Sequence, residues 1–233
     1  MPRWAALGVG AVAVGYREMI AVRRKRSAGR IGGLAAARKV HGWCEIAPMN
    51  ISRYTRTAVI LHWAVAALIL VNIGLAWSAD VLPDEWVRPV IDTHKSTGIT
   101  VLGLVLLRIL WRAGHPPPPM PAHHARWERG LAHAAHGVLY ALMLMLPLSG
   151  WLQDSAWKDA GSHPMTLYGL VPWPRLGFIE SIEPVTKESL HTLFGVFHTG
   201  FGYALYALLF LHIAGALKHQ FVDRDPELQR MSM

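Results

Sequence analysis

Four long apolar stretches constrain this chain more than any other feature of its sequence. They cover residues 58–77, 90–111, 131–152 and 190–217, and the formal charges of the second lie only toward its ends. A helix that crosses a bilayer needs about 20 apolar residues, whereas a surface helix of a soluble protein carries a polar face. We therefore predict an all-α integral membrane protein, folded as a four-helix bundle and surrounded by membrane lipid.

The distribution of charge excludes a nucleic-acid-binding protein. Charged residues make up only 16% of the chain, against about 25% in soluble domains. The net charge of +8 is concentrated in residues 1–48, where nine Lys and Arg face two acidic residues. Residues 49–233 carry fourteen bases against thirteen acids. Without a basic patch on the folded part, no nucleic acid is expected as a partner.

Residues 1–48 form a separate basic extension in this interpretation. Their apolar run, residues 4–15, is too short to span a bilayer, and a basic cluster follows it directly. A signal peptide would lack that cluster and would end in a small-residue cleavage site. We expect an upstream extension, with the natural product beginning at Met49; the alternative is a basic tail that contacts anionic lipid.

The placement of Lys and Arg predicts the orientation of the helices. Bases precede the first stretch, fill the link 112–130 and follow the fourth stretch, whereas the segment 154–189 holds three bases against five acids. Cytoplasmic loops carry the excess of Lys and Arg. Both termini and the link 112–130 are therefore predicted to be cytoplasmic.

Histidine is the residue type that points to chemistry. The chain has thirteen histidines and one cysteine, Cys44, which excludes an intrachain disulfide, a cysteine-based zinc site and a C-x-x-C-H haem attachment. His198 and His212 are fourteen residues apart on the fourth stretch, about 21 Å along a helix and within about 40° of the same face. His94 is expected at the depth of His198, and His62 at the depth of His212. The sequence thus predicts an outer layer, His94 and His198, and an inner layer, His62 and His212.

Two imidazoles at one depth on facing helices are what a six-coordinate haem iron requires. Glycines near these positions give a flat ring room between helices: Gly98, Gly103, Gly195, Gly200 and Gly202. A helix–helix hydrogen bond is the simpler interpretation of a single intramembrane histidine, but four in two matched layers favour ligands. A zinc site or a histidine-lined metal transport path is less favoured, because a transport path would also place carboxylates inside the helices.

Four further histidines lie close enough to these layers to contribute. His133 and His136 begin the third stretch, so either could face the inner layer. His191 precedes His198 at the outer end, and His219 follows His212 beside Lys218 at the cytoplasmic interface. The simplest role of these side chains is interfacial, or a hydrogen bond to a haem propionate.

Several segments together resemble a known family. They are RYTRTAVILHW (53–63), HKSTGITVLGLVLLRILWR (94–112) with the prolines after it, LAHAAHGVLYALMLMLPLSGW (131–151) and ALYALLFLHIAGALKHQFVDRD (204–225). Over about residues 51–231 the chain is similar to the bacterial cytochrome b561 family, whose members are four-helix, di-haem membrane proteins related to the cytochrome b subunits of hydrogenases. The resemblance implies two haem b groups with iron ligands at His62 and His212 and at His94 and His198.

The resemblance also implies a function and a location. Members of the family carry electrons across the bacterial inner membrane to the ubiquinone pool, as part of respiratory electron transport. One branch is similar to superoxide oxidase, which would make this chain an oxidoreductase, with Arg88, Lys95 and Lys187 as the outer bases available to steer the anion. His219 resembles the histidine of the quinone site.

An alternative within the family is a haem-b anchor and electron conduit for a partner redox enzyme. A third interpretation, the metal transporter, predicts no porphyrin. The oligomeric state is left open.

Overall fold

The computed structural model describes residues 53–120 and 125–233. The predictions for residues 1–48 lie outside the described residues. Four long helices account for most of the rest: α2 (Arg56–Ser78), α3 (Asp84–Gly114), α4 (Arg126–Ser155) and α6 (Pro184–Leu217). The short elements are η1 (Ala160–Ser162), β1 (Thr166–Leu167), β2 (Val171–Pro172), α5 (Gly177–Glu180), a π-helix η2 (Lys218–Val222) and α7 (Glu227–Arg230).

The four long helices confirm the predicted fold class. Each is long and apolar enough to cross a membrane, with α6 and η2 forming one continuous span, Pro184–Val222. Only a small share of each span is buried inside the bundle, and large apolar side chains such as Leu70, Leu110 and Phe210 are exposed, as expected when the surrounding solvent is lipid. The chain is thus a membrane-spanning helical protein.

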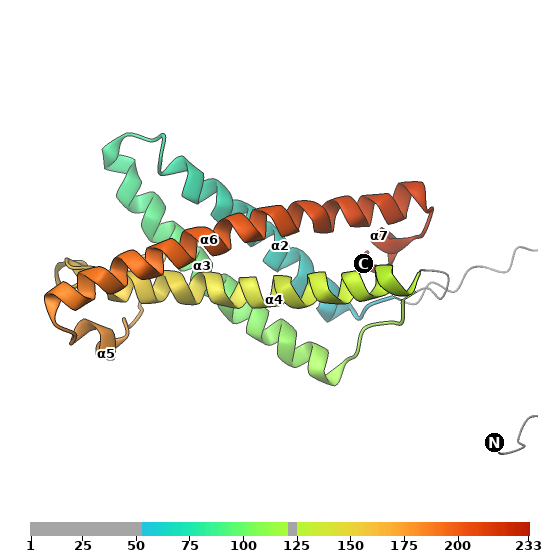
Figure 1. Ribbon diagram of the computed structural model, residues 1–233, viewed down its shortest axis with the longest axis horizontal. Coiled ribbons are helices and arrows are strands. Elements are labelled where there is room, and N and C mark those ends of the chain that lie inside the picture. The colour runs from blue at the N-terminus through green and yellow to red at the C-terminus, as the bar shows by residue number, and fades with distance from the viewer. Residues whose placement is uncertain (1–52, 121–124) are drawn as a thin grey trace, which may run out of the picture. The chain divides into compact units, whose positions relative to one another are not determined.

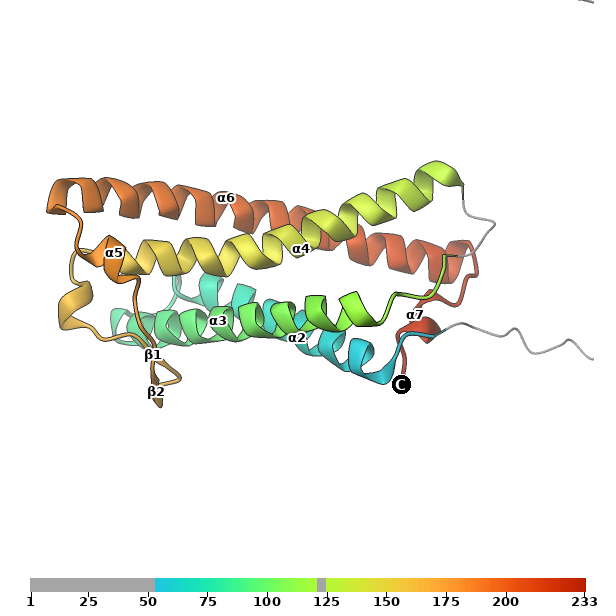
Figure 2. The same cartoon turned by 90° about the horizontal axis from the view of Figure 1, so that it is seen from below.

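The helices are arranged as two antiparallel pairs. α2 packs on α3 and α4 on α6, and the first pair crosses the second obliquely, with α3 against α4 (Figures 1 and 2). One small apolar core, Val65, Val101 and Val105, joins α2 to α3. A second, Leu139, Leu142 and Leu205, joins α4 to α6. We call the end where α2 and α4 begin the His62 end, and the end where α3 and α6 begin the His94 end.

All four helices extend beyond the predicted stretches, because an apolar pattern detects only the part of a helix that lies in the membrane. α3 begins at Asp84 and not near residue 90, so residues 84–89, between the first two predicted stretches, are also helical. α6 begins at Pro184, where the Glu183 side chain accepts hydrogen bonds from the N–H groups of Val185 and Thr186. Such N-terminal caps satisfy free N–H groups that the membrane pattern does not register.

The described chain ends meet at the His62 end. The Tyr54 N–H donates to the Arg230 carbonyl at 3.2 Å, and the Trp63 indole donates to the Met231 carbonyl at 2.9 Å. The Arg230 guanidinium also donates to the Pro118 and Pro119 carbonyls of the link between α3 and α4. The start of α2, this link and the C-terminal segment therefore share one side of the bundle, which agrees with an even number of spans.

Candidate functional site

The first histidine pair joins α3 to α6 at the His94 end. The ring centres of His94 and His198 are 6.1 Å apart and their planes are 81° to each other. His94 Nδ1 lies 3.1 Å from the Asn72 carbonyl of α2, and His198 Nδ1 lies 3.0 Å from the Leu146 carbonyl of α4. Because a carbonyl only accepts, each Nδ1 carries the hydrogen, and each Nε2 keeps its lone pair for a metal.

The second pair joins α2 to α6 at the His62 end. The ring centres of His62 and His212 are 6.4 Å apart with their planes at 68°. A third ring, His136 of α4, stands edge-on to His212 with its centre 5.2 Å away. Arg108 of α3 interacts electrostatically with His62 and His212, and its Nε donates to the Tyr140 hydroxyl at 2.8 Å. This end therefore gathers three imidazoles and a cation.

The spacing within each pair fits two axial ligands on one iron. A metal–imidazole bond is about 2 Å and a ring centre lies about 1 Å behind its nitrogen, so two ligands on one metal have centres about 6 Å apart. Among residues 53–120 and 125–233, no group of three His, Cys, Asp or Glu side chains is arranged to hold a bare metal ion. Two imidazoles suit an iron whose other four ligands come from a porphyrin, so the residues present fit a haem at each pair.

The glycines only partly follow the sequence prediction. A Cβ at Gly103 or Gly200 would meet no atom within 4 Å, which leaves open space beside these helices. Gly195 has a different role, because a Cβ there would lie 2.9 Å from the Gln153 side-chain amide of α4, which would have to shift. Gly150 was not among the predicted glycines, yet a Cβ there would lie 3.1 Å from the His198 ring. Gly150 is the residue that lets this imidazole lie against α4.

The other candidate histidines separate into one that joins the site and three that do not. His136 lies beside His212 at the His62 end. His133 is exposed, with Nδ1 2.6 Å from the Arg129 carbonyl of its own helix. His191 Nδ1 lies 2.9 Å from the Gln153 carbonyl. His219 lies in the π-helix that follows α6, with Nδ1 2.7 Å from Asp223.

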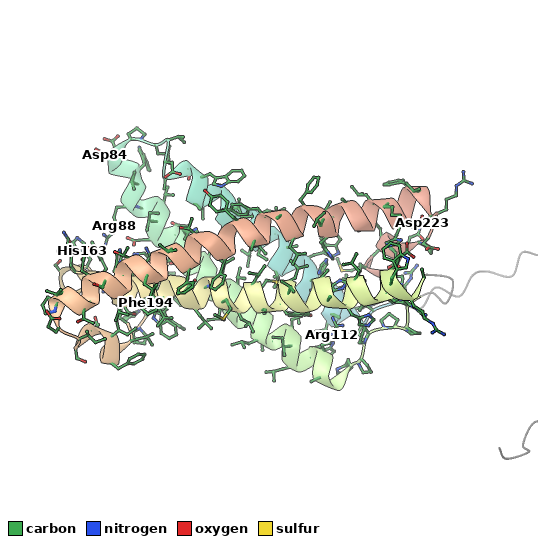
Figure 3. All side chains as sticks on the ribbon, viewed as in Figure 1. Asp84, Arg88, Arg112, His163, Phe194 and Asp223 are labelled. Atoms are coloured by element: carbon green, nitrogen blue, oxygen red, sulfur yellow. The ribbon has the colours of Figure 1, made fainter. Side chains whose placement is uncertain are left out.

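The Lys218 ammonium donates to the Asp223 carboxylate at 2.7 Å. The hydrogen bonds from Lys218 and, secondarily, from His219 hold the pKa of Asp223 below its ordinary value. Figure 3 shows Asp223 at the end of the bundle opposite Arg88. His219 is therefore part of a cluster of charged side chains at the His62 end.

The predicted outer bases belong mostly to an ion network. Asp154 accepts from Lys95 at 2.7 Å and from Arg175 at 2.8 Å, and the Asp154 and Arg175 side chains are each only 6% exposed. Arg88 pairs with Asp92 at 3.0 Å and lies over the Trp157 ring. The network holds three bases and two acids, so its formal charge is +1. Among the described residues, Lys187 is not part of it; it lies in the first turn of α6.

Arg108 and Asp154 were not among the predicted site residues; Asp154 was counted only among the acids of the segment 154–189. Both lie within helices that cross the membrane, at Asp84–Gly114 and Arg126–Ser155. An ionisable residue in such a helix is costly and marks a functional or pairing position, and this rule could have identified them.

Comparisons with known proteins identify the family of the chain. The sequence profile of the prokaryotic cytochrome b561 family matches residues 53–232. Cytochrome b561 homolog 2 of Escherichia coli (strain K12) is 28% identical over 182 residues, which is 77% of this chain and 90% of the relative.

Two further relatives have similar identity and coverage. The probable superoxide oxidase CybB of Yersinia pestis is 27% identical over 77% of this chain and 95% of the relative. Cytochrome b562 of Cereibacter sphaeroides is 27% identical over 76% of this chain and 94% of the relative. With four membrane-spanning helices and a profile match over most of its length, this chain belongs to the prokaryotic cytochrome b561 family of bacterial membrane proteins.

Proposed function

We propose that the chain carries electrons one at a time across the bacterial inner membrane through two b-type haems. His62 and His212 hold one haem, and His94 and His198 hold the other. The observation that carries the proposal is the spacing of the two ring pairs, 6.4 and 6.1 Å, which suits axial ligands of one iron. Along α6 the two ligands are about 21 Å apart, so the haems would bridge most of the membrane.

The protein's contribution is to fix the ligands. Haem b supplies an iron that gains and loses one electron, and ligation by two imidazoles leaves no open position on it. The Asn72 and Leu146 carbonyls fix the ring orientation and tautomer of His94 and His198. The apolar bundle excludes water from the rings. Held by two histidines at each site, the haems would pass electrons one at a time between the two ends of the bundle.

Ubiquinone is the proposed electron acceptor, at the His62 end. Its reduction to the quinol takes two electrons and two protons, so the site must receive two electrons in succession. His219 is the proposed proton donor, because an imidazole can donate a proton and its Nδ1 lies 2.7 Å from the Asp223 carboxylate. Protons from the cytoplasm would then restore His219 after each transfer.

Superoxide is the proposed electron donor, at the His94 end. Two superoxide anions would release two electrons and two molecules of O2 for each quinone reduced. Support comes from the similarity to the probable superoxide oxidase of Yersinia pestis and from the net +1 charge of the ion network at this end. A positive site attracts a small anion to the surface. The positions of Lys and Arg favour an orientation with this end outside the cytoplasm.

The test uses purified protein in proteoliposomes that contain ubiquinone. Superoxide generated outside should reduce ubiquinone, with two superoxide anions consumed for each quinol formed. A His94→Ala variant should abolish the reaction, and a His133→Ala variant should retain it. Absence of superoxide-driven reduction in protein that carries haem would contradict superoxide as the donor.

A redox protein docking at the His94 end is the second candidate for the donor. The observation that favours it is the pairing of Lys95 and Arg88 with carboxylates, which weakens their attraction for a small anion. The chain would then be a membrane anchor and conduit for a partner enzyme. Retention of both haems without superoxide activity, together with a copurifying redox subunit, would support this candidate.

A further inference from the structure

A short β-hairpin between α4 and α6 lies against the side of α3. β1 pairs antiparallel with β2, with Thr166 opposite Pro172 and Leu167 opposite Val171. The Leu170 N–H donates to the Leu167 carbonyl at 2.9 Å and closes the turn. Tyr168 and Gly169 have φ angles of 52° and 71°, as a hairpin turn of the mirror-image type requires. The turn is therefore a defined structure and not an irregular loop.

Hydrogen bonds fix the depth of this turn along α3. The Tyr168 N–H donates to Ser96 Oγ at 2.9 Å, Ser96 Oγ lies 3.3 Å from the Thr166 carbonyl, and the Tyr168 hydroxyl lies 3.0 Å from Thr100 Oγ1. Ser96 is only 1% exposed beneath the hairpin. The turn is thus held at the level of Ser96, and its tyrosine points on toward Thr100.

Ser96 lies nearer the middle of the bundle than the charged end of α4. It follows His94 by two residues toward the His62 end. On α4, the His198 ring contacts Ser149 Oγ, which is five residues inward of Asp154. Allowing for helix tilt, these offsets put the turn roughly 5–10 Å inward of the Asp154 level. The segment leaves α4 at Ser155, descends to the turn, and returns where Arg175 pairs with Asp154.

The surface of the hairpin has the character of a lipid-facing surface. Leu170 is 83% exposed, Val171 55% and Tyr168 50%, and Figure 2 shows the hairpin projecting from α3 away from the α4–α6 pair. Within the turn, the Tyr168 N–H is paired with Ser96 Oγ and the Leu170 N–H with the Leu167 carbonyl. Each such pairing lowers the cost of bringing non-helical backbone close to lipid.

We propose that the hairpin Thr166–Pro172 re-enters the membrane and binds the lipid of the leaflet at the His94 end. Leu170 and Val171 contact the acyl chains, and the Tyr168 ring packs among them with its hydroxyl bonded to Thr100. The partner is bulk phospholipid, recognised by apolar contact. The proposal rests on the membrane-spanning helices alone, so it stands or falls separately from the haems and from superoxide.

The test measures the depth of nitroxide labels on single-cysteine variants in proteoliposomes. In a Cys44→Ser background, labels are placed at Leu170→Cys and, separately, at Val171→Cys. Leu70→Cys is the matched lipid control, because Leu70 is exposed on α2 two residues inward of Asn72, the same offset as Ser96 from His94. Lys158→Cys, exposed on the same connecting segment, is the aqueous control.

Collision with O2 and with a water-soluble nickel chelate reports the environment of each label. We expect the labels at Leu170 and Val171 to match Leu70, with strong collision with O2 and weak collision with nickel, and the Lys158 label to show the reverse. A nickel accessibility at Leu170 and Val171 equal to that at Lys158 would overturn the proposal. So would low collision with both reagents, which would indicate a covering protein. An unchanged absorption spectrum and elution volume confirm that each variant is folded.

Discussion

The two histidine pairs lie on the same four helices, but the protein holds them in different ways. At the His94 end, backbone carbonyls of α2 and α4 orient both rings. At the His62 end, His212 has another imidazole, His136, 5.2 Å away, and Arg108 lies nearby. Backbone hydrogen bonds fix a ligand's geometry, whereas nearby charges set its electrostatics. One pair therefore has its orientation determined by the main chain, and the other has its electrostatics set by side chains.

The charged side chains around the two histidine pairs also differ. At the His94 end, Lys95 and Arg175 are both paired with the buried Asp154 carboxylate. At the His62 end, the Arg108 Nε donates to a neutral phenol, so its positive charge acts on the neighbouring imidazoles. Two haems in these sites should differ in reduction potential, which gives an electron a direction of flow.

The largest expected effect comes from removing ligands. His94→Ala and His198→Ala should each remove the same haem, and His62→Ala and His212→Ala should each remove the other, because one imidazole cannot keep iron six-coordinate. Difference spectra and redox titration of the purified variants measure which component is lost.

His136→Ala is the matched control for the His62 end. It should retain both haems, although His136 is the ring nearest to His212. Loss of a haem in His136→Ala with retention in His62→Ala would show that the pairing at this end is wrong.

The second expected effect is on stability at the His94 end. Asp154→Asn leaves Lys95 and Arg175 without their shared buried carboxylate, which should cost about 2–4 kcal/mol. Thermal unfolding followed by haem absorbance measures the loss. Asp92→Asn is the control: its pair with Arg88 is about half exposed, so it should cost about 1 kcal/mol or less. Equal losses in the two variants would show that the network is not a buried one.

The third expected effect is on potential at the His62 end. Arg108→Gln removes a cation that stabilises the electron-rich reduced state. An interaction of about 1–2 kcal/mol corresponds to a fall of about 40–90 mV in that haem's potential for one electron. Redox titration should show this fall in one haem only. An equal shift of both potentials, or a rise, would contradict the placement of Arg108 beside a single site.

The smallest expected effect is on the acid stability of the surface at the His62 end. The hydrogen bond from Lys218, and then that from His219, keeps the pKa of Asp223 below its ordinary value. The stabilisation by this carboxylate is therefore complete above the unfolded pKa, about 3.9, and is lost as pH falls through the lower folded value. The difference in Tm between wild type and Asp223→Asn should be constant from pH 8 to 5 and disappear in stronger acid. A difference that disappears above pH 5 would contradict the lowered pKa.

The helices and the histidine layers could be predicted from the sequence because both are periodic. A charge-free run long enough for a bilayer has few alternatives, and a spacing of fourteen residues between His198 and His212 fixes a common face of one helix. For the rings to meet, facing helices then had only to bring the histidines to the same depth. The rings of each pair do lie about 6 Å apart. Their role as ligands remains a prediction.

The hydrogen-bond and ion-pair partners that hold the site residues could not be predicted in this way. The acceptors for His94 and His198 are backbone carbonyls of Asn72 and Leu146, which have no side-chain signature. The contact of Arg175 with Asp154 joins residues 21 apart through a connecting segment whose path depends on the hairpin. That hairpin depends on a Tyr168–Gly169 turn with positive φ angles, too short a pattern to distinguish from an ordinary loop.

The number of haems per chain tests the central claim most directly. Protein purified from membranes should contain two b-type haems for each polypeptide, determined from the pyridine haemochrome spectrum and a quantitative amino-acid analysis of the same sample. Redox titration of that sample should resolve two one-electron components. A ratio of one haem per chain, or the absence of b-type haem, would contradict two sites formed by two pairs of histidines.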